Sequence, residues 1–146
     1  MCAYNALSGQ PCCGNDLLMM DILRNKWAFT GYVTSDCGGI NHFHMRHKTH
    51  PDKQSAAADA VLHGTDCECS NNGAYHALNL AVAEGLIKEE QIDVSLQRLF
   101  EIRMRLGMFD PVEMVPYSNI TTDVLECEVH KAHALQMAQE SVVLLK

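Results

Sequence analysis

The residue best placed to do chemistry in this sequence is Asp36, which follows a short apolar segment. Residues 31–35 are rich in β-branched and aromatic side chains, and Gly38 and Gly39 come soon after the aspartate. This pattern predicts a buried strand that ends in a turn. At the carboxyl end of a parallel strand, a carboxylate can act as nucleophile, base or metal ligand. The same position also suits an aspartate that only caps the turn.

A second candidate site is a group of histidines and cysteines. The histidines are His42, His44, His47 and His50, and Cys67 and Cys69 come later in the chain. Histidines two and three residues apart in a loop could bind zinc or nickel. This pattern allows a small stand-alone domain that binds a metal or a partner. The alternative is a polar loop whose imidazoles bind no metal.

The cysteines do not form a recognisable metal motif. There are seven of them, an odd number that cannot all pair within the chain. None lies in a CxxC pair, so the spacing differs from that of a zinc ribbon. Such a high cysteine content slightly favours an oxidising compartment.

The expected elements alternate between helices and strands. Apolar periodicity, capping residues and glycine stops predict helices from Asn15-Asp16 to near Asn25 and over 51–64, 75–84, 93–106 and 130–140. Strands are predicted at 31–35, 65–69 and 142–145, loops at 5–15 and 41–50, and a linker over 108–122. This order is typical of βα units in a parallel sheet. Two or three units cannot close a barrel, so we expect the chain to be part of a larger protein.

Bulk composition excludes several classes of function. The chain has 146 residues, and 47% apolar with 20% charged residues is typical of a globular domain. A net charge of −7 argues against a nucleic-acid partner, because phosphate binding needs a basic face. No apolar run approaches the roughly 18 residues that span a membrane. The first residues show no signal-peptide pattern.

Several motifs together resemble glycoside hydrolase family 3. They begin with Met1-Cys2-Ala3-Tyr4-Asn5 and Gly9-Gln10-Pro11, and continue through residues 27–36, which end in Thr-Ser-Asp. Further matches follow in the same order: His63-Gly64-Thr65-Asp66, Gly85-Leu86-Ile87, Arg105-Leu106-Gly107-Met108-Phe109-Asp110-Pro111 and residues 138–146. The similarity covers nearly the whole chain.

The resemblance implies a fold, a function and a set of site residues. Residues 1–108 would be the C-terminal part of a (β/α)₈ barrel, 109–129 a linker, and 130–146 the start of an α/β sandwich domain. The protein would be part of a retaining, exo-acting β-glycosidase that removes terminal β-D-xylosyl or β-D-glucosyl residues, with arabinose as a related option. Asp36 would be the nucleophile, and Tyr4 and Met1 would contact the sugar.

The same resemblance implies what lies outside the chain. The acid/base residue would come from the second domain, so we expect the isolated chain to be inactive. The family's sugar-binding Lys-His pair and Arg would lie earlier in the barrel. No cofactor or metal is implied, the partner is a xylo- or gluco-oligosaccharide, and no nucleic acid or membrane is involved. The full-length enzyme would be secreted or periplasmic.

Cys37 departs from the β-glucosidase pattern, in which a Trp often follows the nucleophile. A Cys here, with Cys69 downstream, resembles the β-xylosidase branch and implies a disulfide between Cys37 and Cys69. Closing this loop of about 30 residues would add roughly 3 kcal/mol. The alternative is two reduced thiols packed as small apolar groups. In this branch a histidine often occupies the position of His47, in a polar loop that lines the sugar site.

Overall fold

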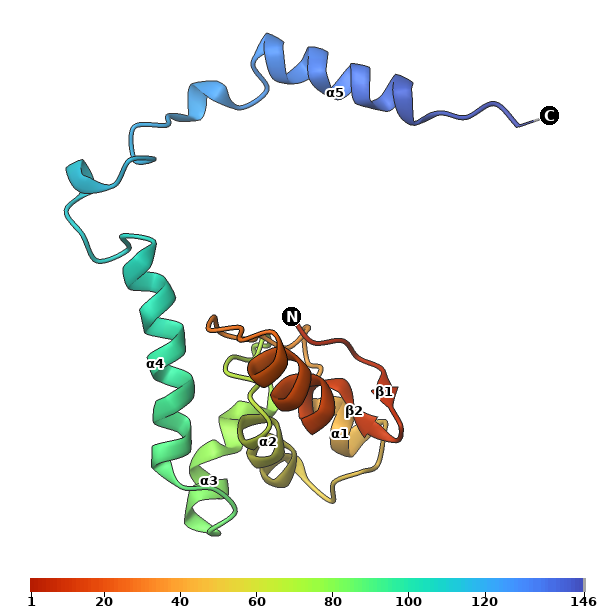
Figure 1. Cartoon of the computed structure of the whole chain (residues 1–146), viewed down its shortest axis with the longest axis vertical. Helices are drawn as coiled ribbons and strands as arrows, with labels where there is room; N and C mark the ends of the chain where they lie inside the picture. Colours follow the sequence, from red (N-terminus) through yellow and green to blue (C-terminus); the bar gives the residue numbers. More distant parts are fainter. Residues whose placement is uncertain (146) are drawn as a thin grey trace. The chain divides into compact units, whose positions relative to one another are not determined.

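The computed structural model describes residues 1–145, which form two compact units, Met1–Leu106 and a second that begins at Gly107 (Figure 1). The first unit contains β1 (Ala6–Leu7), β2 (Gln10–Pro11), η1 (Cys12–Gly14), η2 (Leu17–Lys26), α1 (Asn41–Met45), α2 (Lys53–Leu62), η3 (Ala74–Ala77), α3 (Leu78–Ala83) and α4 (Glu89–Arg105). The second contains η4 (Val112–Met114), η5 (Thr122–Val124) and α5 (Glu128–Ser141).

Three segments that lie far apart in the sequence run parallel beside each other in the first unit. Cys2 bridges Ser35 on one side, and Thr34 bridges Cys67 on the other. Backbone bonds join them, among them Cys2 N to Thr34 O at 3.0 Å and Ser35 N to Cys67 O at 2.8 Å. The strands predicted at 31–35 and 65–69 are therefore present only as isolated parallel bridges. Because η2 and α2 lie between these segments in the sequence, the predicted βα order is kept.

Helix α2 is the centre of the core. Ala56, Ala57 and Ala60 are fully buried, and these small side chains let η1, η3 and α3 approach closely. Its N-terminus is capped by Asp52, which accepts from Ser55 N at 2.9 Å, so the helix begins two residues later than the predicted Pro51. The helix ends at Leu62, two residues before the predicted Gly64, which follows the C-cap His63 with φ at +86°.

Most of the other predicted helices are present with shifted ends. The Asn15 side chain accepts from Leu18 N at 3.0 Å, which confirms the predicted start of the first helix. That helix, η2, has π geometry, which periodicity does not reveal. The predicted helix over 75–84 is a short 3₁₀ turn, η3, followed by α3. Helix α4 begins at Glu89, four residues before the predicted Asp93.

Three predictions about local structure are wrong. The expected loop over 5–15 contains the hairpin β1–β2, with Ala6 opposite Pro11. The expected loop over 41–50 begins with α1, whose Phe43 is buried against the core. Residues 142–145 form no strand and are exposed, because no neighbouring segment is present in the described second unit to pair with them.

The first unit is tied together by a disulfide and by a buried ion-pair cluster. Cys2 and Cys13 are bonded, with Cα atoms 5.2 Å apart. The Asp66 carboxylate is fully buried and accepts from Arg24 at 2.7 Å, Arg98 at 2.9 Å and Val33 N at 2.8 Å. The Asp66 contacts fix the segment that carries Asp36 to the segment of Asp66 and to α4, and the disulfide fixes Cys2 to η1.

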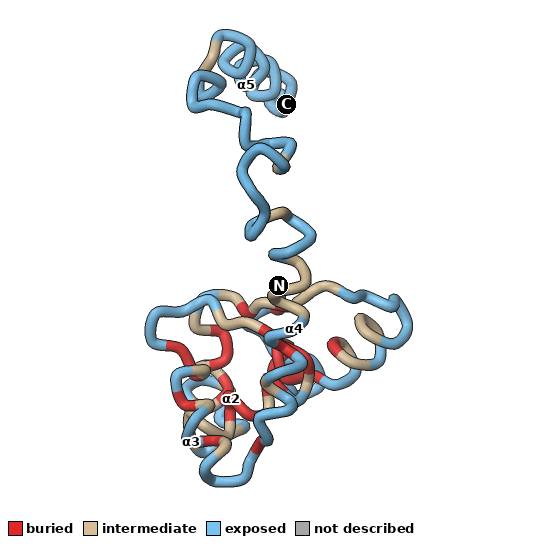
Figure 2. Tube along the Cα trace, turned by 90° about the vertical axis from the view of Figure 1, so that its left-hand side faces the viewer, coloured by how far each residue is buried: buried red, intermediate tan, exposed pale blue. Residues whose placement is uncertain are grey.

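The second unit buries none of its residues 107–145 (Figure 2). Apolar side chains along it are exposed, including Val112, Tyr117, Leu125, Leu135 and Leu144. No described helix of either unit is long and apolar enough to cross a membrane.

Candidate active site

Asp36 lies where the central parallel segment turns away from the other two. Its amide donates to Cys2 O at 3.3 Å, and its carbonyl accepts from Gly39 N at 2.8 Å, which closes the turn predicted from the two glycines. Gly38 adopts φ +68°, a conformation that favours glycine. The Asp36 Oδ1 atom accepts from Cys37 N at 2.7 Å, so the rotation of the carboxylate is fixed by the backbone.

Tyr4 lies beside Asp36. Its hydroxyl donates to Cys37 O at 2.6 Å, although the two residues are 33 positions apart in the sequence. Desolvation raises the pKa of the phenol, and the charge and hydrogen bonding of the neighbouring Asp36 carboxylate raise it further. Tyr4 therefore stays protonated next to an acidic residue, as a donor on the rim of a carboxylate site.

Cys37 and Cys69 are the next neighbours of the carboxylate. Their sulfur atoms are 2.8 Å apart, and both cysteines are free thiols in the structure. The two thiols lie close together because hydrogen bonds join their segments. Gly38 N donates to Cys69 O at 3.0 Å, and Cys69 N donates to Ser35 Oγ at 3.3 Å. The Cys69 thiol raises the pKa of the Cys37 thiol, with a smaller contribution from Asp36. The disulfide between them stays a prediction.

Met1, the other predicted sugar contact, lies elsewhere. It precedes the Cys2–Ser35 bridge and lines a hollow of about 190 Å³ together with Leu23, Phe29 and Tyr32. The structure therefore brings together Tyr4, Asp36, Cys37 and Cys69 but does not bring Met1 to them. The role of Met1 as a sugar contact stays a prediction.

The histidines have separate partners. The ring centroids of His42 and Tyr4 are 5.0 Å apart, and His47 Nε2 lies 2.8 Å from Tyr4 O. His50 Nε2 lies 3.5 Å from the Asp59 carboxylate, on α2. His44 has a pKa lowered by desolvation and by the charge of Lys53. Across residues 1–145 no group of three or more His, Cys, Asp or Glu side chains is placed to hold a metal ion.

Two other acidic residues near the site have structural partners. Asp66 is enclosed by its two arginines, as described above. Glu68 accepts from Ala74 N at 2.9 Å and from Tyr75 N at 2.7 Å, which holds the start of η3. The Asp36 carboxylate, by contrast, accepts from the Cys37 amide of its own turn and lies beside the Tyr4 phenol.

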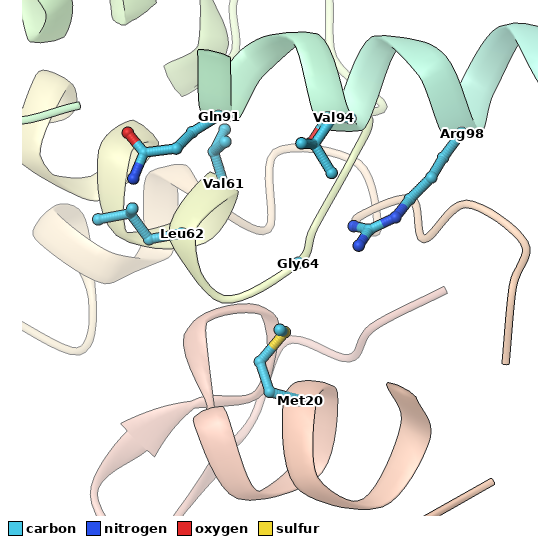
Figure 3. A pocket seen from close by; sticks show the side chains of 8 residues that line it. Met20, Val61, Leu62, Gly64, Gln91, Val94 and Arg98 are labelled. Carbon is cyan, nitrogen blue, oxygen red and sulfur yellow. The ribbon is translucent and has the colours of Figure 1, made fainter. Parts of the chain in front are cut away.

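A groove on another face contains none of the predicted site residues. It has a volume of about 150 Å³ and lies between η2, the end of α2 and α4 (Figure 3). Its walls are mostly apolar and are formed by Met20, Val61, Leu62, Gly64, Gln91, Val94, Ser95 and Arg98. Asp36 is not among the residues that line this groove.

The arrangement around Asp36 suits nucleophilic attack. One carboxylate oxygen is held by an amide, a phenol stands beside it, and the turn leaves the group partly exposed. Sequence reasoning missed the contact of His42 with Tyr4, because it placed the histidines in a possible metal group. The only signal in the sequence is that His42 follows Asp36 by six residues.

Residues 1–102 match the family described as glycosyl hydrolase family 3 N terminal domain. A xylan 1,4-beta-xylosidase of Xylanibacter ruminicola is 40% identical, and the match covers 100% of this chain and 17% of that protein. The probable beta-D-xylosidase 7 of Arabidopsis thaliana is 36% identical, with 100% and 19% covered. The chain thus spans about a fifth of the length of these relatives.

Solved structures agree. A β-glucosidase of Erythrobacter marinus matches with a TM-score of 0.86 at 30% identity, covering 99% of this chain and 19% of that one. The exo-beta-xylosidase XlnD, solved with a xylobiose aziridine activity-based probe, matches with a TM-score of 0.79 at 32% identity, covering 96% and 18%. The chain therefore belongs to glycosyl hydrolase family 3, as its sequence motifs predict, and its first 102 residues are part of the family's N-terminal domain.

Proposed function

We propose that this chain is part of a retaining, exo-acting β-glycosidase in which Asp36 is the nucleophile. The observation that carries the proposal is the placement of the Asp36 carboxylate at the end of a parallel segment, with the Tyr4 phenol beside it. The names of the relatives, β-xylosidases and β-glucosidases, support the reaction class.

The reaction proceeds in two displacements. A carboxylate oxygen of Asp36 attacks the anomeric carbon, and the bond from that carbon to the leaving oxygen breaks as an acid protonates the leaving group. Water then attacks the glycosyl ester on Asp36, with the same acid acting as base, and frees the sugar. Because Oδ1 is held by Cys37 N, we assign the attack to Oδ2.

The acid/base residue lies outside this chain in the proposal. Retaining enzymes place the two carboxyl groups about 5–5.5 Å apart, and Asp66 and Glu68 are occupied by other partners. We propose that residues 1–108 are the C-terminal part of a (β/α)₈ barrel, 109–129 a linker and 130–146 the start of an α/β sandwich domain. The share of the relatives covered and the exposed apolar side chains of the second unit support this division.

We propose terminal β-D-xylosyl residues as the preferred substrate, with β-D-glucosyl residues as the alternative. The thiols of Cys37 and Cys69 lie next to Asp36, and a bridge between them would narrow the space beside the bound sugar. The 40% identity to a xylan 1,4-beta-xylosidase supports the same preference.

The test is mechanism-based labelling of the complete enzyme that carries this segment. A 2-fluoro xyloside should form a stable ester on Asp36, which peptide sequencing would locate. Asp36→Asn should abolish labelling and lower turnover by many orders of magnitude, because a neutral amide cannot form the ester. Asp93→Asn, at an exposed carboxylate, is the control and should still be labelled. A label on Asp66, Glu68 or any other residue would overturn the assignment.

A further inference from the structure

We propose that His42 is a positioning residue: its imidazole packs against the ring of Tyr4 and keeps the phenol hydroxyl on the Cys37 carbonyl, beside Asp36. The placement of Tyr4 follows from contacts in this chain alone. The catalytic meaning of that placement rests on the proposed function.

Tyr4 needs such support because its own contacts are few. The residue is 40% exposed, and its side-chain polar contacts, to Cys37 O and to the Asp36 carboxylate, are both made by the hydroxyl at the tip of the ring. The bond from His47 Nε2 to Tyr4 O fixes the backbone but leaves both side-chain torsions free. An exposed aromatic ring held only at its tip loses those contacts when it rotates into water.

His42 supplies the missing contact to the ring. The two ring centroids are 5.0 Å apart with planes inclined at 31°, within the range of favourable aromatic pairs. The ring of His42 is half-buried, and it lies 6.5 Å from that of His47. The two histidines therefore hold Tyr4 at two points, the ring and the carbonyl.

The position of His42 is itself fixed by the core. It lies in the first turn of α1, between the fully buried Ile40 and the buried Phe43. Its carbonyl accepts from Arg46 N at 2.9 Å and from His47 N at 2.8 Å, which joins the two histidines through the backbone. A side chain on such a rigid base can hold a neighbour in place.

His42 and the carbonyl that accepts from the Tyr4 hydroxyl also lie close together in the chain. Residues 36–39 lead directly into α1, so His42 and the carbonyl that receives the Tyr4 hydroxyl move together. Losing the ring contact would release the phenol from both Cys37 and Asp36.

The experiment is an NMR titration of the 146-residue chain with ¹³C-labelled tyrosine rings, assigned with Tyr→Phe variants. In the wild-type chain, Tyr4 should titrate above the ordinary pKa of a tyrosine, and its ring protons should show a nuclear Overhauser effect to the His42 ring. His42→Ala should shift the Tyr4 pKa down towards the ordinary value for tyrosine. His42→Phe should keep both the raised pKa and a ring-to-ring effect. Asp36→Asn should also lower the Tyr4 pKa.

Several outcomes would overturn the proposal. One is an unchanged Tyr4 pKa in a folded His42→Ala chain. Another is an equal fall of the Tyr4 pKa in His42→Phe, because ring packing would then not be what keeps that pKa raised. If His42→Ala does not fold, the wild-type chain provides the test. A missing nuclear Overhauser effect between the Tyr4 and His42 rings would then contradict the proposal. Failure of Asp36 labelling with an intact Tyr4 result would instead remove the proposed function and leave the positioning role.

Discussion

Replacing Asp66 by Asn should lower the free energy of unfolding of the first unit more than an Asp→Asn change at an exposed position. The Asp66 side chain is fully buried and serves three donors, the guanidinium groups of Arg24 and Arg98 and the amide of Val33. The amide of asparagine keeps one acceptor oxygen but points two N–H donors at a site that already contains only donors. The substitution also leaves two guanidinium charges without a counter-charge.

The size of the effect follows from how exposed each arginine is. The Arg24 side chain is 8% exposed and cannot regain water, and desolvation lowers its pKa while the charge of Asp66 opposes that change. The Arg98 side chain is 26% exposed and can turn towards solvent. Breaking a buried pair typically costs about 3–5 kcal/mol. Because only Arg24 cannot turn towards solvent, we expect the free energy of unfolding to fall by about 3 kcal/mol.

The assay is urea unfolding followed by circular dichroism, with linear extrapolation to water. The matched control is Asp93→Asn on the exposed side of α4, which should change the free energy of unfolding by less than about 0.5 kcal/mol. A loss below about 1 kcal/mol for Asp66→Asn, with an unchanged slope in urea, would refute the view that this cluster anchors the unit.

Three further predictions concern the site and its surroundings. In the proposed function the acid and most of the barrel lie outside this chain, so the purified 146-residue chain should lack general acid catalysis, worth about 10²- to 10⁴-fold, and should not turn over an aryl β-xyloside; clear turnover would contradict this. Iodoacetamide should modify Cys37 more slowly than an ordinary exposed thiol, since its pKa is raised by Cys69, and mild oxidation should yield a Cys37–Cys69 peptide by mass mapping. The folded pKa of His44 is lowered, so the free energy of unfolding should fall as the pH drops below about 6.5 and towards that lowered pKa; His44→Gln should flatten this fall in urea midpoints.

Local chemistry made part of the site predictable from the sequence. Asp36 with its two glycines predicts a turn, and the structure closes that turn with Gly38 in a left-handed conformation. The helix start marked by Asn15 is also found, and α2 ends two residues before Gly64. These features depend on residues close together in the chain, so a single sequence contains the information.

Contacts between distant segments could not be predicted in the same way. The sequence does not tell whether Cys2 pairs with Cys12 or Cys13, because the two candidates are adjacent. In the structure Cys2 is bonded to Cys13, and the two lie in the same buried cluster. The arginine partners of Asp66 are 42 and 32 residues away. The strands were overpredicted because β-branched composition signals burial, while a ladder also needs neighbours to pair with.

The parallel bridges have a consequence for the order of folding. The contact from Tyr4 to Cys37 spans 33 residues and that from Cys37 to Cys69 spans 32, whereas α2 and α4 are held by bonds within a few residues. Closing loops of that length costs chain entropy before the new contacts compensate for it. Local helices therefore form first and the distant contacts follow. The neighbours of Asp36 therefore assemble late, and a mildly destabilised chain would lose its site geometry while its helix content still looked native.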